Sequence, residues 1–206
     1  MAMWTKIKNF ICDIIFPKSC FNCKREDDYL CQDCQAMLEI SGQHRPSPLQ
    51  NIDDLYWACD YNNPLIKNLI HSFKNEPFIR ELGKNLCSLI TAHLQLLDEN
   101  PDFSKFILVP VPLHKKKLRW RGFNQAEELV KELANFLKIP LISNNLIKTK
   151  EGSEDAFICQ GPEKIKGEEI LLVDDFYITG STMAECAKIL RKAGAKKIIG
   201  IVVARG

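Results

Sequence analysis

The sequence lacks long apolar runs, a strong net charge, internal repeats and low-complexity segments. A membrane-spanning helix needs about 18 consecutive apolar residues, and no stretch of this chain reaches that length. Residues 3–16 are amphipathic and interrupted by charge, a pattern that predicts a short helix and is unlike a secretion signal. The formal net charge is only +2, so nucleic-acid binding would have to come from a local basic patch. We therefore expect a cytoplasmic protein without a membrane span.

The 206 residues, 46% hydrophobic and 26% charged, suffice for one globular domain of common size and a small additional module. Strand and helix patterns alternate along most of the chain, which predicts an α/β fold with a mostly parallel sheet. We expect a helix with a cysteine module over residues 1–42, a polar linker over 43–51 and the α/β domain over 52–206. The main expected strands cover residues 55–61, 106–112, 170–173 and 197–204, and the expected helices cover residues 64–74, 78–97, 123–137 and 182–193.

Four of the nine cysteines form two Cys-x-x-Cys pairs separated by seven residues: Cys20, Cys23, Cys31 and Cys34. Two such pairs supply the four thiolates of a tetrahedral zinc site, and so small a module needs the metal to hold its fold. Four protein ligands leave no open coordination position, which indicates structural zinc. An iron–sulfur cluster, two disulfides and a redox-active pair are the alternatives. His44 follows in a proline-rich stretch, and we leave it out of the ligand set.

The segment 170–182 combines a buried strand, two adjacent carboxylates and a glycine loop that leads into a helix. The expected phosphate loop comprises Ile178, Thr179, Gly180, Ser181 and Thr182. Hydroxyls and free backbone N–H groups at a helix N-terminus suit a phosphate. Asp174 and Asp175 would repel that phosphate but suit the hydroxyls of a sugar, directly or through a divalent cation. We predict a ribose 5-phosphate ligand; an acidic turn that caps an ordinary helix is the alternative.

This segment resembles the signature of type I phosphoribosyltransferases, which bind phosphoribosyl pyrophosphate through an Asp-Asp pair and a Thr-Gly-x-Thr loop. The resemblance implies a phosphoribosyltransferase-like α/β domain, with Asp174 and Asp175 on the ribose hydroxyls and Mg²⁺ accompanying the pyrophosphate. The pyrophosphate side is expected at the turn and basic residues that follow the strand over 106–112. Its candidate residues are Leu113, His114, Arg119 and Arg121.

Five of the seven residues from Lys115 to Arg121 are cationic, and aromatic side chains are interleaved with them. They follow a strand whose carboxyl end is expected to face the ligand cleft. Arginine beside aromatic residues can hold phosphates with both arms of its planar fork. We predict contacts with single-stranded DNA, and a solvated run of charge is the alternative. The candidate residues are Lys115, Lys116, Lys117, Arg119, Trp120 and Arg121.

Four motifs occur together in the chain: the four-cysteine module, Val-Pro-Val-Pro at 109–112, Arg-x-Arg-Gly-Phe-Asn-Gln at 119–125 and the Asp-Asp loop. In this arrangement they resemble the ComF family of competence proteins. The resemblance implies a role in natural transformation, in which the protein handles DNA that has entered as a single strand. The stretch 148–157 is shorter than the family's segment near the catalytic loop and lacks its usual glutamine, which favours ligand binding over turnover.

Three hypotheses about function follow. The first is a zinc-stabilised protein that binds phosphoribosyl pyrophosphate, or a related ribose phosphate, and single-stranded DNA. The second is an active phosphoribosyltransferase on an unidentified acceptor. The third is a scaffold whose zinc module docks a competence helicase.

Overall fold

The computed structural model describes residues 18–98, 101–150 and 156–206. The chain divides into two compact units, Met1–Glu39 and Ile40–Gly206. The helix expected over residues 3–16 lies outside the described residues. The described part of the first unit contains both cysteine pairs and the short helix α2 (Gln32–Ala36). Within the described ranges, no helix combines the length and apolar character needed to cross a bilayer.

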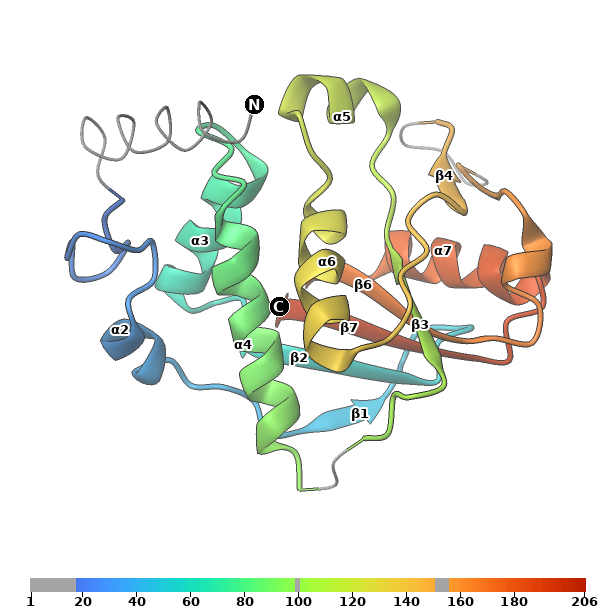
Figure 1. The fold of residues 1–206 in the computed structure, drawn as a ribbon, viewed down its shortest axis with the longest axis horizontal. Helices are drawn as coiled ribbons and strands as arrows, with labels where there is room; N and C mark the ends of the chain where they lie inside the picture. Colours follow the sequence, from blue (N-terminus) through green and yellow to red (C-terminus); the bar gives the residue numbers. More distant parts are fainter. Residues whose placement is uncertain (1–17, 99–100, 151–155) are drawn as a thin grey trace. The chain divides into compact units, whose positions relative to one another are not determined.

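The second unit is built on a five-stranded sheet in the order β1-β2-β7-β6-β3 (Figure 1). Four strands run parallel to their neighbours: β2 (Asp54–Asp60), β7 (Lys197–Arg205), β6 (Glu169–Tyr177) and β3 (Phe106–Pro110). The predicted α/β fold with a mostly parallel sheet is thus confirmed. At one edge, β1 (His44–Pro46) pairs antiparallel with β2. These three residues fall in the stretch that we expected to be a linker.

Helices cover both faces of this sheet. In Figure 1, α4 (Leu82–Leu96) and α6 (Gln125–Leu137) lie beside each other on the near face, and α7 (Ser181–Lys192) lies on the far face. A two-stranded sheet of β4 (Leu146–Lys148) and β5 (Phe157–Cys159), followed by the 3₁₀ turn η1 (Pro162–Lys164), precedes β6.

The helix α3 (Pro64–Lys74) was predicted correctly because several local signals agree. The side chain of Asn63 accepts hydrogen bonds from the N–H groups of Leu65 (2.9 Å) and Ile66, which satisfies orphan donors of the first turn. Pro64 occupies the first helical position, where a missing N–H costs nothing. The apolar residues that follow at intervals of three and four form one buried stripe.

The core lies on both sides of β6, whose apolar residues are buried in succession. Ile170 and Leu172 belong to a cluster with Met183, Cys186 and Leu190 of α7. Leu171 and Val173 are also fully buried and point to the opposite face, because side chains of a strand alternate. A strand covered on both faces therefore reads as a continuous apolar run.

The strand β1 in the expected linker and the start of α4 at Leu82, not at residue 78, differ from expectation, and two further differences concern the site. The central strand does not end at Val173 but continues through both aspartates to Tyr177, because β7 supplies a pairing partner along this whole length. The basic stretch forms a helix, α5 (Lys115–Arg121), which begins after His114 and ends at Gly122 with φ of 83°. The helix was not predicted because its residues are mostly cations and show no apolar periodicity.

Candidate functional site

The strands β3 and β6 separate where β6 turns from apolar to charged. Their last paired residues are Pro110 and Val173, and one further bond joins the N–H of Val111 to the carbonyl of Val173 (2.9 Å). Beyond it, β6 continues beside β7 while the chain after β3 runs into α5. A pocket opens at this point, at the carboxyl ends of parallel strands, where ligands bind in open α/β sheets.

Two neighbouring pockets share the side chain of Asp174. The first, about 230 Å³ in volume, is lined by both aspartates, by the turn after β3 and by cationic side chains from α3, α5 and β4. The second, about 400 Å³, is lined mainly by the end of β6 and the glycine loop. Lys74 and Thr182 also line both pockets. The site therefore has a cationic compartment and a loop compartment with a carboxyl group between them.

The two aspartates point to opposite faces of β6, as successive strand residues do. Only 1% of the surface of Asp175 is exposed, and its Oδ1 accepts a hydrogen bond from the N–H of Phe176 (2.9 Å). The same oxygen lies 2.9 Å from Nζ of Lys74, the last residue of α3. This ion pair compensates the charge of a carboxylate that water hardly reaches.

Asp174 is half-buried, and its Oδ1 accepts a hydrogen bond from the N–H of Asp175 (2.9 Å). Burial, and secondly the charge of Asp175, raise the pKa of Asp174 to about 8, although Lys74 acts in the opposite direction. At neutral pH these surroundings therefore favour the protonated carboxyl, and a cation bound beside it would favour the charged form.

The glycine loop has the form expected of a phosphate cradle. Gly180 has φ of +68°, and a Cβ atom there would lie 2.2 Å from Cε2 of Tyr177, so only glycine fits without rearrangement. Gly180 brings no side-chain cap to α7, which leaves the N–H groups of Thr182 and Met183 for a ligand, while the N–H of Ser181 donates a long hydrogen bond to Oγ1 of Thr179 (3.5 Å). All five predicted loop residues line the second pocket: Ile178, Thr179, Gly180, Ser181 and Thr182.

Three of the four residues predicted for the pyrophosphate side line the first pocket: Leu113, His114 and Arg121. Arg119 is not among the lining residues. The guanidinium of Arg121 donates a hydrogen bond to Oε1 of Gln125, whose Nε2 donates to the carbonyl of Phe73 (2.9 Å). The buried Nε of Arg121 has no hydrogen-bond partner in the described part of the chain. The guanidinium of Arg121 is thus held in place at the pocket wall, and its Nε–H remains as a hydrogen-bond donor.

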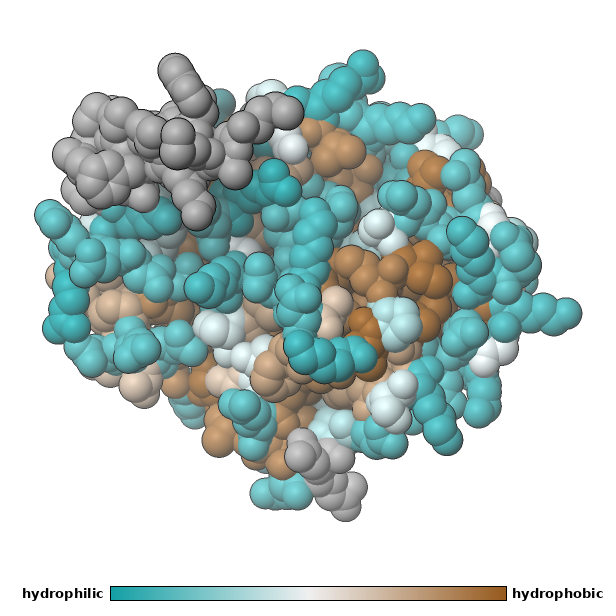
Figure 2. Space-filling view, in the orientation of Figure 1, coloured by the Kyte–Doolittle hydropathy of each residue, from teal (hydrophilic) through white to brown (hydrophobic). Residues whose placement is uncertain are grey.

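Helical spacing divides the basic residues near α5 into two groups. His114, Lys117 and Arg121 follow one another at intervals of three and four residues, and all three line the first pocket. No residue of α5 is buried, and Figure 2 shows hydrophilic side chains over this helix at the top of the view. The remaining predicted DNA contacts are exposed: Lys115, Lys116, Arg119 and Trp120.

Sequence reasoning did not select Lys74, Asn124 or Lys148, which also line the first pocket. Lys74 lies far from the aspartates in sequence and meets them only through the topology of the sheet. A lysine that ends a helix is a weak signal, because a cation there is already favoured by the helix dipole. Lys148 is the first residue of the stretch 148–157, and its place at the end of β4 brings it to the pocket.

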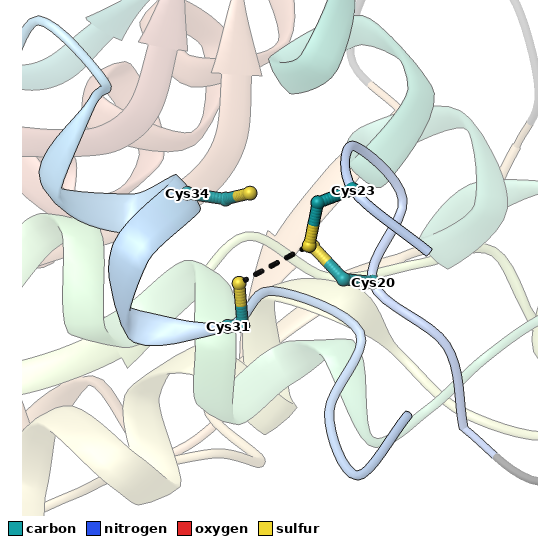
Figure 3. A group of neighbouring side chains, drawn as sticks. All are labelled: Cys20, Cys23, Cys31 and Cys34. Carbon is teal, nitrogen blue, oxygen red and sulfur yellow. Dashed lines mark hydrogen bonds between the residues drawn. The ribbon is translucent and has the colours of Figure 1, made fainter. Parts of the chain in front are cut away.

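The four predicted zinc ligands come together in the first unit. The ligand atoms of Cys20, Cys23, Cys31 and Cys34 all lie within 4.8 Å of one another, and Figure 3 shows their sulfur atoms pointing toward a common centre. Burial alone would raise the pKa of the Cys20 thiol, but backbone hydrogen bonds from Cys31, Cys23 and Asn22 lower it to about 6. The Cys34 backbone lowers the pKa of Cys31, but burial and side-chain hydrogen bonds within the cluster raise it to about 12. Four cysteine ligands at this spacing could hold a metal ion.

Comparison with known proteins agrees with this arrangement. The family model of the phosphoribosyl transferase domain matches residues 121–206, which include the Asp-Asp pair and the glycine loop. The competence protein ComFC of Streptococcus pneumoniae is 29% identical over 202 residues, which cover 91% of this chain and 82% of that protein. The DNA utilization protein YhgH of Escherichia coli K12 is 29% identical over 210 residues, covering 87% of this chain and 85% of that protein.

Among solved structures, a hypoxanthine phosphoribosyltransferase from Staphylococcus aureus is similar over 60% of this chain and 62% of its own, with 14% identity and a TM-score of 0.39. The assignment rests instead on the sequence relatives, the family model and the four neighbouring cysteines. The chain is therefore a homologue of the ComFC and YhgH proteins, and its residues 121–206 match the phosphoribosyl transferase domain, in agreement with its resemblance to the ComF family.

Proposed function

We propose that this protein binds phosphoribosyl pyrophosphate in the two pockets and single-stranded DNA on α5, and that it handles incoming DNA in the cytoplasm during natural transformation. The observation that best supports this proposal is the position of Asp174 between the glycine loop and the cationic pocket. The groups of the proposed ligand follow the same order as the loop, the carboxyl group and the cationic pocket: a phosphate, sugar hydroxyls and a pyrophosphate. The names of the relatives, competence protein and DNA utilization protein, support the role in DNA handling.

Each part of the ligand has a chemically suitable partner. The first-turn N–H groups of α7 and the loop hydroxyls would hold the 5-phosphate. Asp174, at the boundary of both pockets, would hold the ribose hydroxyls. His114, Lys117 and Arg121 would hold the pyrophosphate.

Magnesium is the metal expected at this site. It prefers oxygen ligands and is commonly bound by one or two carboxylates together with substrate phosphates. Asp174 fits this role, because it is a half-buried carboxyl group at the boundary of both pockets. Bound there, magnesium would neutralise charge on the pyrophosphate. The four-cysteine cluster is separately proposed to hold a structural zinc ion, whose four sites would all be filled by protein.

The outer face of α5 is proposed to bind DNA. Lys115, Lys116 and Arg119 are exposed there, and Trp120 offers an exposed aromatic ring between them. Cations that follow the backbone and an aromatic side chain that stacks on bases are the usual elements of single-strand binding. The net charge of the chain is small, so this local patch would provide the attraction.

Binding of phosphoribosyl pyrophosphate to wild type and to Asp174→Ala, measured by calorimetry with and without Mg²⁺, tests the proposal. We expect wild type to bind with Mg²⁺ and to melt at higher temperature with the ligand, because binding to the folded state alone stabilises it. The variant should remain folded and lose this shift. Equal binding by both proteins would place the sugar elsewhere.

Phosphoribosyl transfer to an acceptor is a second candidate function. The position of the Asp174 carboxyl between the glycine loop and the cationic pocket favours it, since a carboxylate beside the sugar can stabilise the positive charge that develops there during transfer. Release of pyrophosphate when candidate acceptors are added would reveal transfer. Ligand binding without release would leave the handling of DNA as the function.

A further inference from the structure

Lys74 occupies a fixed position at the centre of the site. Its Nζ lies 2.9 Å from Oδ1 of Asp175 and 3.6 Å from the centroid of the Phe176 ring. That ring stacks on Tyr61, with centroids 4.9 Å apart and planes at 19°. The Lys74 ammonium group is therefore held in place by a carboxylate on one side and by an aromatic ring, itself stacked on a second ring, on the other.

Asp175 lines the first pocket together with Asp174, but its burial and existing contacts leave little of it for a ligand. Its side chain is almost completely buried, and Oδ1 already accepts from Lys74 and from the N–H of Phe176. The other oxygen, Oδ2, is buried and has no hydrogen-bond partner among the described residues. Lys74 is more accessible, with 25% of its side chain exposed, and it lines both pockets.

The charges of the site also favour contact between Lys74 and the ligand. A ligand with several negative charges has to enter a site that holds two adjacent carboxylates. Lys74 neutralises the buried one, and an ammonium group has three donors, of which Asp175 uses one. The remaining donors can reach oxygen atoms of a ligand that spans the boundary between the pockets.

We propose that Lys74 binds the phosphate oxygens of phosphoribosyl pyrophosphate, and that Asp175 acts through Lys74 as a positioning residue and does not itself touch the sugar. This inference rests on the proposed function and divides the roles of the two aspartates. Asp174 contacts the ligand or its cation, whereas Asp175 holds the ammonium group in place. A lysine that only compensates a buried carboxylate would affect stability and leave ligand affinity intact.

The first test compares ligand affinity of Lys74 variants, measured by calorimetry with Mg²⁺ on proteins whose folding is checked by melting. Lys74→Met should weaken binding by about tenfold to a hundredfold, the usual effect of losing a hydrogen bond to a charged group. Lys74→Arg keeps the charge and should restore most of the affinity. Lys67→Met is the matched control: Lys67 also lies on α3 and over an aromatic ring, Tyr61, but lines neither pocket.

The second test separates positioning from contact. Asp175→Asn should weaken binding in the wild-type background and cause no further loss in the Lys74→Met background, because both changes remove the same interaction. The double variant also avoids an uncompensated buried charge, which keeps the comparison possible if Lys74→Met alone folds poorly. Equal losses from Asp175→Asn in both backgrounds would mean that Asp175 contacts the ligand itself.

The outcomes distinguish this inference from the function on which it rests. If wild type binds neither phosphoribosyl pyrophosphate nor inorganic pyrophosphate, the proposed function fails and the inference with it. If wild type binds and Lys74→Met behaves like Lys67→Met, only the role of Lys74 is overturned.

Discussion

The ring of Trp120 stands edge-on against Phe78, with centroids 4.8 Å apart and planes at 84°. The contact orients the indole without burying it, because 61% of Trp120 remains exposed. Trp120 is thus not buried as an anchor of the core. An oriented, exposed aromatic ring among cations is typical of a site at which nucleic-acid bases stack.

Replacing Trp120 by alanine should weaken binding of an oligonucleotide by about 1–3 kcal/mol at every salt concentration, because stacking depends little on screening. Trp120→Phe should retain part of this affinity. Fluorescence titration of a labelled single strand measures both. A variant that melts at lower temperature but binds normally would make Trp120 a structural residue.

Replacing Arg119 by alanine should reduce the salt dependence of DNA binding. Each phosphate contact on a single strand contributes about −0.7 to the slope of log affinity against log salt, so Lys115, Lys116 and Arg119 together account for roughly −2.1. Arg121→Ala is the matched control, since Arg121 lines the pocket and should affect phosphoribosyl pyrophosphate more than DNA. If Arg119→Ala keeps the wild-type slope, DNA binds elsewhere.

The order of strands and helices was largely predictable because the apolar periodicity of this chain is clear. The helix over 64–74 appears with the expected bounds, since its cap, its first proline and its buried stripe all agree. The length of β6 was not predictable, because pairing with β7 overrides the two carboxylates that mark a strand end in sequence. Lys74 was missed for a similar reason: only tertiary structure brings α3 to Asp175.

Changing Cys34 to serine should remove the metal from the first unit. Four thiolates within 4.8 Å suit one zinc ion per chain, and a module this small depends on the metal for its folding energy. Elemental analysis should therefore give one zinc in wild type and much less in the variant. Cys159→Ser is the control, since Cys159 lies in β5, outside the cluster. Metal-free wild type with an intact first unit would contradict the assignment.

Affinity for phosphoribosyl pyrophosphate with Mg²⁺ should rise with pH up to about 8. The groups around Asp174 include Asp175 and Lys74, and the pKa of Asp174, about 8, means that the carboxyl must lose a proton to bind a cation. One proton released gives at most about a tenfold gain per pH unit. Calorimetry from pH 6 to 8.5 measures this, and an affinity that follows only the titration of the ligand itself would mean that Asp174 is ionised over the whole range.

The proton on Asp174 should lower the stability of the ligand-free protein as pH rises, whereas its loss raises ligand affinity. Between pH 4 and 8 the folded state retains a proton on Asp174 that the unfolded chain, with its ordinary pKa of 3.8, has lost. This group therefore makes unfolding easier as pH rises, by at most about 1.4 kcal/mol per pH unit. Melting of wild type and Asp174→Asn over this range should diverge accordingly; parallel curves would mean that Asp174 is ionised throughout.

Replacing Gly180 by alanine should abolish ligand binding and also lower stability. A Cβ atom would meet the Tyr177 ring at 2.2 Å, and the positive φ adds strain of about 1–3 kcal/mol. The loop has to move to relieve the clash, which displaces the N–H groups proposed to hold the 5-phosphate. Gly167→Ala separates the two effects, because Gly167 has φ of +83°, open space around its missing Cβ and no place in either pocket. The control should lose stability and keep affinity, whereas a Gly180→Ala protein with wild-type affinity would exclude this loop as the phosphate site.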